Sequence, residues 1–150
     1  MTDNQYYAKL WLNRAYNISL KIDALRHKRE KVQASMSGVA QYGDREFTST
    51  SGNATETRML EYSMLSQQID EEEEKLAAED IRTQEVINHL SGTEMMDKFN
   101  AVLRYRYASR LGWSEIADKI YYSESQTHEY HLQALEAVYP FIPKEEVHED

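Results

Sequence analysis

The residues best suited to chemistry lie in the segment SESQTHEYHLQAL, residues 123–135. Its two histidines, His128 and His131, lie about one helical turn apart and would share one helix face. Such a pair is typical of a metal site, but HEYH is not the HExxH pattern of zinc enzymes, and the nearby candidate for a third ligand is Glu124. We therefore expect no metal and no cofactor, and both histidines at the surface or facing a phosphate.

Other enzyme chemistry has little support in this sequence. There is no cysteine, no glycine-rich phosphate loop and no nucleophile elbow. The carboxylates, including the run DEEEEK at residues 70–75, fall on expected helix surfaces without a visible pocket. We therefore expect a binding protein and no enzyme, with the acidic run solvated or docked on a basic partner.

Composition and charge narrow the class of protein further. Five glycines and two prolines in 150 residues favour helix over sheet. The net charge of −9 disfavours nucleic acid, yet residues 1–36 hold seven Lys and Arg against three Asp and Glu, and local patches matter more than the total. No apolar stretch is long enough to span a membrane or to act as a signal peptide. We expect a cytoplasmic protein without membrane contact.

Two long helices should occupy the first part of the chain. Apolar residues recur at helical spacing from residue 6 to 36 and again from 56 to 89, with basic residues on the outer side of the first helix. The predicted stripes are Trp11, Ala15, Ile18, Ile22, Leu25, Val32 and Met36, and Tyr62, Leu65, Ile69, Leu76, Val86 and Leu90, with Glu72, Glu79 and Thr83 as polar interruptions. An all-α fold follows, in which residues 1–91 form a long antiparallel, coiled-coil-like helical hairpin with a loop at 36–55. The same stripes would also serve pairing between subunits, so a homo-oligomer is expected.

A second domain of three shorter helices should follow, over residues 92–150. Gly92 ends the preceding helix and Thr93 caps the next one. The buried residues of the first of these helices are expected to be Met95, Phe99, Val102, Leu103 and Tyr107. The second helix opens at WSEIADKI with Ser114 as its N-cap, and Ser123 caps the last helix before an acidic tail. The inward stripe of the last helix should consist of Thr127, Tyr130, Ala134, Leu135 and Val138.

The sequence of this last domain is similar to that of a known DNA-binding motif. The segment LRYRYASRLGWSEIADKIYYSESQTHEYHLQALEAV resembles the helix-turn-helix of sigma-factor region 4. Over nearly its whole length the chain is similar to small phage proteins of Gram-positive bacteria that are related to the ArpU and RinA late transcriptional activators. The resemblance implies regulation of transcription for a phage or prophage in the host cytoplasm, with double-stranded DNA and host RNA polymerase as partners.

The matched pattern implies which residues face DNA. The last helix would present its exposed side to the major groove, with Lys119 and His128 near phosphate. The expected DNA-binding set is Arg110, Ser114, Lys119, Tyr122, Glu124, Ser125, Gln126, His128 and Glu129. Arg or Lys is usual at positions that here hold Glu, Gln or His, so a monomer should bind weakly and need a second subunit or a tether. The alternative function is a protein-interaction module or inhibitor that captures host machinery through an acidic helical surface.

Overall fold

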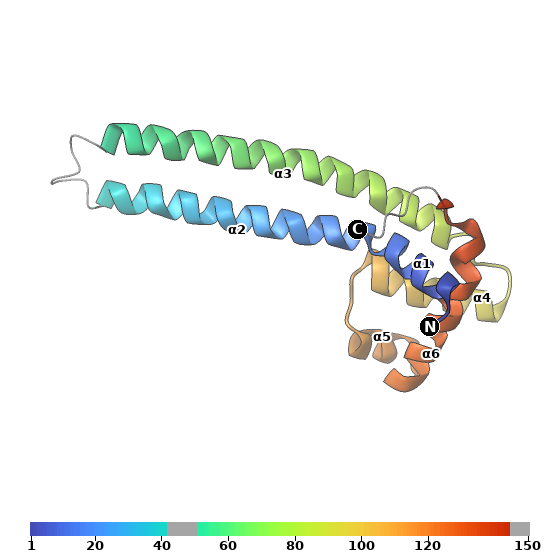
Figure 1. The fold of residues 1–150 in the computed structure, drawn as a ribbon. Helices are drawn as coiled ribbons and strands as arrows, with labels where there is room; N and C mark the ends of the chain where they lie inside the picture. The colour runs from blue at the N-terminus through green and yellow to red at the C-terminus, as the bar shows by residue number, and fades with distance from the viewer. Residues whose placement is uncertain (42–50, 145–150) are drawn as a thin grey trace. The chain divides into compact units, whose positions relative to one another are not determined.

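The protein is all-α over the part of the chain that the structure describes, as predicted. The computed structural model describes residues 1–41 and 51–144, without the side chains of 37–41 and 51–53, and these residues contain helices and no strand. Figure 1 shows the helices α1 (Asp3–Leu12), α2 (Arg14–Gln41), α3 (Ser51–Ile87), α4 (Glu94–Leu103), α5 (Trp113–Ile120) and α6 (Glu124–Val138). A π-helical turn (Arg104–Ala108) follows α4, and a short 3₁₀ helix (Tyr139–Phe141) follows α6. The chain divides into two compact units, one made of residues 1–17 with the chain from Ala77 onward, the other of residues 18–76.

The first predicted helix is interrupted. Where the sequence pattern predicted one helix over residues 6–36, α1 ends at Leu12 and α2 begins at Arg14. Thr2 caps α1 through a capping box, in which the Gln5 backbone N–H donates to Thr2 Oγ1 (3.1 Å) and the Thr2 N–H donates to Gln5 Oε1 (2.7 Å). Because α1 is a separate helix, its buried face of Ala8, Trp11 and Leu12 can enter the core of the first unit.

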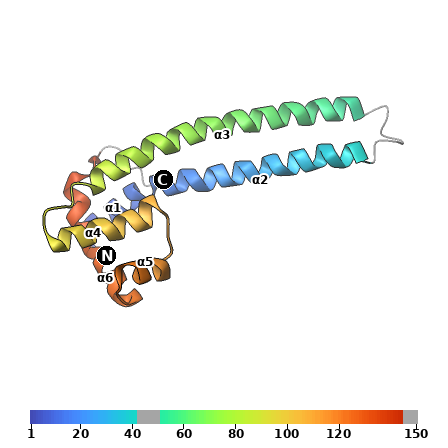
Figure 2. The same cartoon turned by 180° about the vertical axis from the view of Figure 1, so that it is seen from behind.

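The core of the first unit joins both ends of the sequence. Trp11 of α1 and Ile87 of α3 belong to one buried cluster with Leu103 of α4 and with Leu135 and Val138 of α6. Both α1 and α4 pack against α6, as the two opposite views show (Figures 1 and 2). The division of the structure therefore does not coincide with the boundary predicted between residues 91 and 92. Burial of the large apolar residues of α1 explains the difference, since they gain far more by packing with the C-terminal helices than by facing water.

The link between α3 and α4 follows the sequence prediction at Thr93, but Gly92 does not end α3, which ends earlier, at Ile87. Gly92 has a left-handed backbone (φ +102°), and the Thr93 hydroxyl accepts the Met96 backbone N–H at 3.1 Å, which caps α4. Within α4, Phe99 is buried as predicted, but Met95 is 43% exposed, so its predicted burial is wrong. The neighbouring Met96 packs against the core instead.

The second unit consists of parts of α2 and α3. Lys21 Nζ donates to Glu72 Oε2 (3.3 Å) and Arg29 Nη1 donates to Ser66 Oγ (3.1 Å). Residue numbers therefore rise along α2 as they fall along α3, so the two helices are antiparallel. The buried apolar residues of this unit are Ile22, Val32, Leu65 and Ile69.

The loop predicted at residues 36–55 is shorter than expected. α2 continues to Gln41 and α3 starts at Ser51, so residues 36–41 and 51–55 are helical. The rest of the predicted loop, with Tyr42 and Phe47, lies outside the described residues. Ser, Thr and Gly are poor helix formers by local propensity, and continuation of a long packed helix outweighs that preference.

Candidate nucleic-acid interface

The start of α5 is fixed by Gly112 and Glu115. Gly112 has an extended backbone at the N-cap position, and its N–H donates to Glu115 Oε1 at 3.5 Å. Ser114 lies inside the first turn and is exposed, so its predicted role as N-cap is wrong. The reason is that a cap at Gly112 places a glutamate three residues later, where its side chain can return to the cap, whereas a cap at Ser114 would place Ala117 there.

The turn between α5 and α6 orients the last helix. Tyr121 takes a left-handed conformation (φ 64°, ψ 38°), which is uncommon for a non-glycine residue, and its side chain is 92% exposed. Ser123 caps α6 as predicted, since its Oγ accepts the Gln126 backbone N–H at 3.1 Å. Thr127 Oγ1 donates to the Ser123 carbonyl (2.8 Å), and Ala117 is buried on α5. The first turn of α6 is therefore held by its own side chains.

Most of the predicted base-reading residues lie on the open face of α6. Glu124, Ser125, His128 and Glu129 are exposed at positions i, i+1, i+4 and i+5, which form one side of a helix. Gln126 is half-buried beside them. This face offers carboxylate, hydroxyl, amide and imidazole groups to a partner.

Arg110, which the sequence analysis assigned to the DNA-binding set, and the nearby Arg106 are both engaged inside the protein. Arg110 Nη2 donates to Asp80 Oδ1 of α3 at 2.9 Å, and Nη1 donates to the Ala108 carbonyl. Arg106 Nη1 donates to the Leu111 carbonyl (3.0 Å), and its guanidinium lies 4.6 Å from the centre of the Trp113 ring. The structure therefore does not place Arg110 among the groups open to DNA, because its charge is already paired. Lys119, by contrast, is exposed on α5.

His131 is a buried residue, so its predicted place at the surface is wrong. It is 5% exposed, and its Nε2 lies 2.7 Å from the hydroxyl of the buried Tyr107. The Trp113 ring lies 4.6 Å from the His131 ring and 4.5 Å from the exposed His128 ring. Burial lowers the pKa of His131 to about 3 and raises the pKa of Tyr107, so both side chains are neutral near pH 7. Its position in the sequence could have predicted this burial, because His131 lies four residues after Thr127 and so falls on the inward stripe of the helix.

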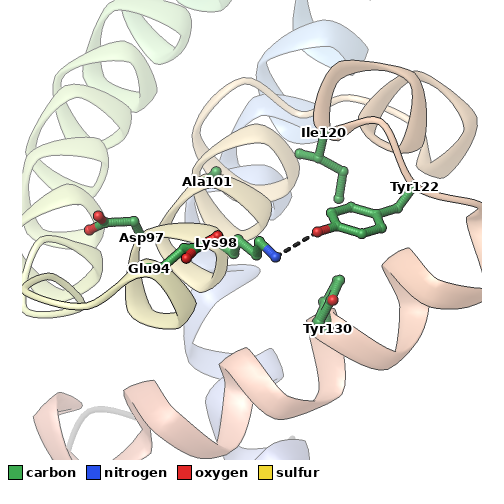
Figure 3. A pocket seen from close by; sticks show the side chains of 7 residues that line it. All are labelled: Glu94, Asp97, Lys98, Ala101, Ile120, Tyr122 and Tyr130. Atoms are coloured by element: carbon green, nitrogen blue, oxygen red, sulfur yellow. Dashed lines mark hydrogen bonds between the residues drawn. The ribbon is translucent and has the colours of Figure 1, made fainter.

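Sequence reasoning missed a lysine that contacts the turn. Lys98 of α4 donates from Nζ to Tyr122 Oη at 2.5 Å, and the Tyr122 and Tyr130 rings meet edge to face at 5.1 Å. These three side chains line a hollow of about 340 Å³, and Figure 3 shows the lysine chain reaching toward the two tyrosines from the helix that also carries Glu94 and Asp97. A contact of the Tyr122 hydroxyl with DNA, as predicted, would compete with this bond, since the hydroxyl already accepts from Lys98.

The lysine and the tyrosine alter each other's acidity. The hydrogen bond between them raises the pKa of Lys98 and lowers the pKa of Tyr122. A cation beside two aromatic rings is also stabilised by their electron-rich faces, and Lys98 Nζ lies 5.0 Å and 5.6 Å from the ring centres of Tyr122 and Tyr130. The contact joins α4 to the turn and thereby helps to position the start of α6.

Comparison with known proteins adds no assignment. No family model, no curated protein and no solved structure matches this chain. No helix in residues 1–41 or 51–144 has both the length and the apolar composition to cross a membrane. The same residues contain no group of three or more His, Asp or Glu side chains arranged to hold a metal ion.

Proposed function

We propose that this chain is a regulator of transcription that binds double-stranded DNA through α5, the turn and α6, without catalysing a reaction. The observation that carries the proposal is the exposed face of Glu124, Ser125, His128 and Glu129 at the start of a helix whose N-terminus Ser123 fixes. A major groove admits such a helix, and the N-terminal residues of a recognition helix contact base edges. The resemblance of this segment to sigma-factor region 4 and to phage late activators supports the same role.

The side chains on this face suit base edges better than phosphates. Glutamate accepts from the cytosine amino group, and glutamine bonds adenine through two atoms. Phosphate contacts need cations, and Arg106 and Arg110 are engaged with other parts of the protein. We therefore expect weak binding by one copy. The logarithm of its association constant should fall only slowly with the logarithm of the salt concentration, with a slope of about −1 to −2. A second copy, or attachment to host RNA polymerase, would supply the remaining affinity.

A fluorescence anisotropy titration against phage promoter fragments tests this function, at about 50 mM and about 200 mM salt. Lys119→Glu should weaken binding to all fragments alike, whereas Gln126→Ala should change the preference between fragments. Lys31→Glu, on an exposed position of α2, is the matched control and should leave binding unchanged. Absence of binding to every fragment at the lower salt concentration would exclude the DNA function.

One observation favours a second candidate, a module that captures a basic host protein. Residues 113–138 hold one lysine against five Asp and Glu, and Glu115, Asp118, Glu124 and Glu129 are all exposed. An acidic face of this kind attracts a basic partner surface. The double variant Glu124→Gln and Glu129→Gln separates the candidates. It should release a basic protein partner, whereas under the DNA function it should keep DNA binding and change the preference between fragments, because glutamine bonds different base edges. Glu71→Gln with Glu74→Gln on α3 is the control.

A further inference from the structure

The second unit exposes an apolar strip on α3 beside its buried one. Leu65 and Ile69 are buried in this unit, but Leu60 is 62% exposed and Met64 is 57% exposed. Leu60 and Met64 are four residues apart, so they lie on one side of the helix. Together with Lys28 of α2 they line a groove of about 300 Å³. Exposed apolar side chains of this size, gathered in one groove, indicate a contact surface.

Two opposite charges flank this groove. Lys28 comes from α2 and Glu61 from α3, and both side chains are exposed. Within the described part of the chain neither has a hydrogen-bond or ion-pair partner, whereas the nearby Lys21 and Arg26 are paired with acids of α3. The groove thus presents a cation on one helix, an anion on the other, and an apolar strip.

We propose that this groove, formed by Lys28, Leu60, Glu61 and Met64, is the contact surface for a second copy of the same chain, related by a two-fold axis. In a two-fold contact each surface meets itself, so Lys28 of one copy faces Glu61 of the other, and the reverse pair forms as well. A partner of a single charge sign would satisfy one flank and oppose the other. A second copy satisfies both, and it covers Leu60 and Met64 with their own counterparts.

The two-fold contact also addresses the thin core of this unit. Two helices bury few apolar residues between them, and packing against another pair gives a four-helix arrangement with more buried surface. The contact does not depend on what α6 binds, so it goes beyond the proposed function. It provides two copies of α6 in one assembly, whatever their target.

Charge reversal tests the two-fold pairing in the full-length chain, with sedimentation velocity as the measurement. Lys28→Glu alone places two acids opposite each other at both contacts, and Glu61→Lys alone places two lysines there. Each variant by itself should lose at least about tenfold in dimer affinity. An equimolar mixture of the two variants should form a heterodimer, because every contact then joins opposite charges. The double variant should dimerise like the unmodified chain.

The controls separate this contact from general charge effects and from misfolding. Lys31→Glu and Glu74→Lys change exposed charges outside the groove and should leave dimerisation unchanged. Leu60→Asp should abolish the dimer while circular dichroism shows unchanged helix content, because Leu60 is exposed in the single chain. An unmodified chain that stays monomeric at high micromolar concentration overturns the proposal. So does a mixture of the two single variants that fails to associate.

Discussion

The two compact units bury polar groups by different means. In the unit of residues 1–17 with 77–144, His131 is enclosed beside Tyr107 and Trp113 and is neutral near pH 7. In the unit of residues 18–76, Glu72 is buried to a similar extent, yet Lys21 and Lys75 approach it from solvent and keep it charged. A thick aromatic core excludes charge, whereas a thin pair of helices lets long side chains bridge from water to a buried carboxylate.

The two units also differ in how much of their apolar surface they bury. The first unit draws fully buried side chains such as Trp11, Leu103 and Leu135 from helices at both ends of the sequence. The second unit buries residues of α2 and α3 alone and leaves Leu60 and Met64 exposed. The first unit therefore supports the exposed face of α6 on a core of many helices, and the second unit carries the surface on which we propose the two-fold contact.

The largest expected effect comes from removing the α1 anchor of the first unit. Trp11→Ala deletes a fully buried indole that packs in the shared core, and it should lower the free energy of unfolding by about 3–5 kcal/mol. Tyr6→Ala on the exposed side of the same helix should change it by less than about 0.5 kcal/mol. Urea unfolding followed by circular dichroism measures both. Equal effects would mean that α1 is no part of this core.

Mild acid should destabilise the first unit through its buried histidine, His131. His131 must lose its proton to fold, since burial lowers its pKa to about 3, and the unfolded chain binds more protons below its ordinary value of 6.5. Stability should therefore fall as pH drops below about 6.5, by about 1.4 kcal/mol per pH unit. Urea unfolding between pH 7 and pH 5 measures the slope. His131→Gln should flatten it and His128→Gln should keep it, and a chain whose slope survives His131→Gln would contradict the buried neutral state.

The sequence was sufficient to predict the caps of α4 and α6, although not the cap of α5. Helix starts depend on residues three or four apart, so the caps at Thr93 and Ser123 could be predicted from their spacing. The inward stripe of α6 followed from helical periodicity in the same way, with Thr127 and Leu135 buried as expected.

Contacts between distant residues could not be predicted in this way. Arg110 is paired with Asp80, thirty positions earlier, and Lys98 of α4 contacts Tyr122 in the turn after α5. Residue type misled at His131, because a polar side chain was assigned to the surface although its position lies on the inward stripe. Such pairs depend on how helices pack, and local spacing does not contain that information.

A smaller effect is expected at the buried carboxylate of the second unit. Burial raises the pKa of Glu72, but hydrogen bonds from Lys75 and Lys21 outweigh it, so the pKa lies below its ordinary value of 4.5. Its contribution to stability is thus present above pH 4.5 and is lost as pH falls through the lowered pKa. Glu72→Gln should cost up to about 1 kcal/mol at pH 7, because both lysines are exposed. Thermal unfolding at pH 7 measures it, with Glu71→Gln as the exposed control, and a loss as large as that of Trp11→Ala would contradict the contrast between the units.

The smallest effect is a change in tyrosine acidity without a measurable change in stability. It tests, within the first unit, the contrast between a buried polar group and one that a lysine contacts. The Tyr122 hydroxyl accepts a hydrogen bond from the half-buried Lys98, which lowers its pKa, so Tyr122 should ionise early. Burial raises the pKa of Tyr107, which should therefore ionise late. Carbon NMR of the tyrosine Cζ atoms during a titration resolves the two. Lys98→Met should raise the pKa of Tyr122, because the cation that stabilises the phenolate is gone, while Lys119→Met should leave it unchanged. An unaltered Tyr122 in the Lys98 variant would show that α4 does not hold the turn through this bond, and that the start of α6 is positioned by its own caps.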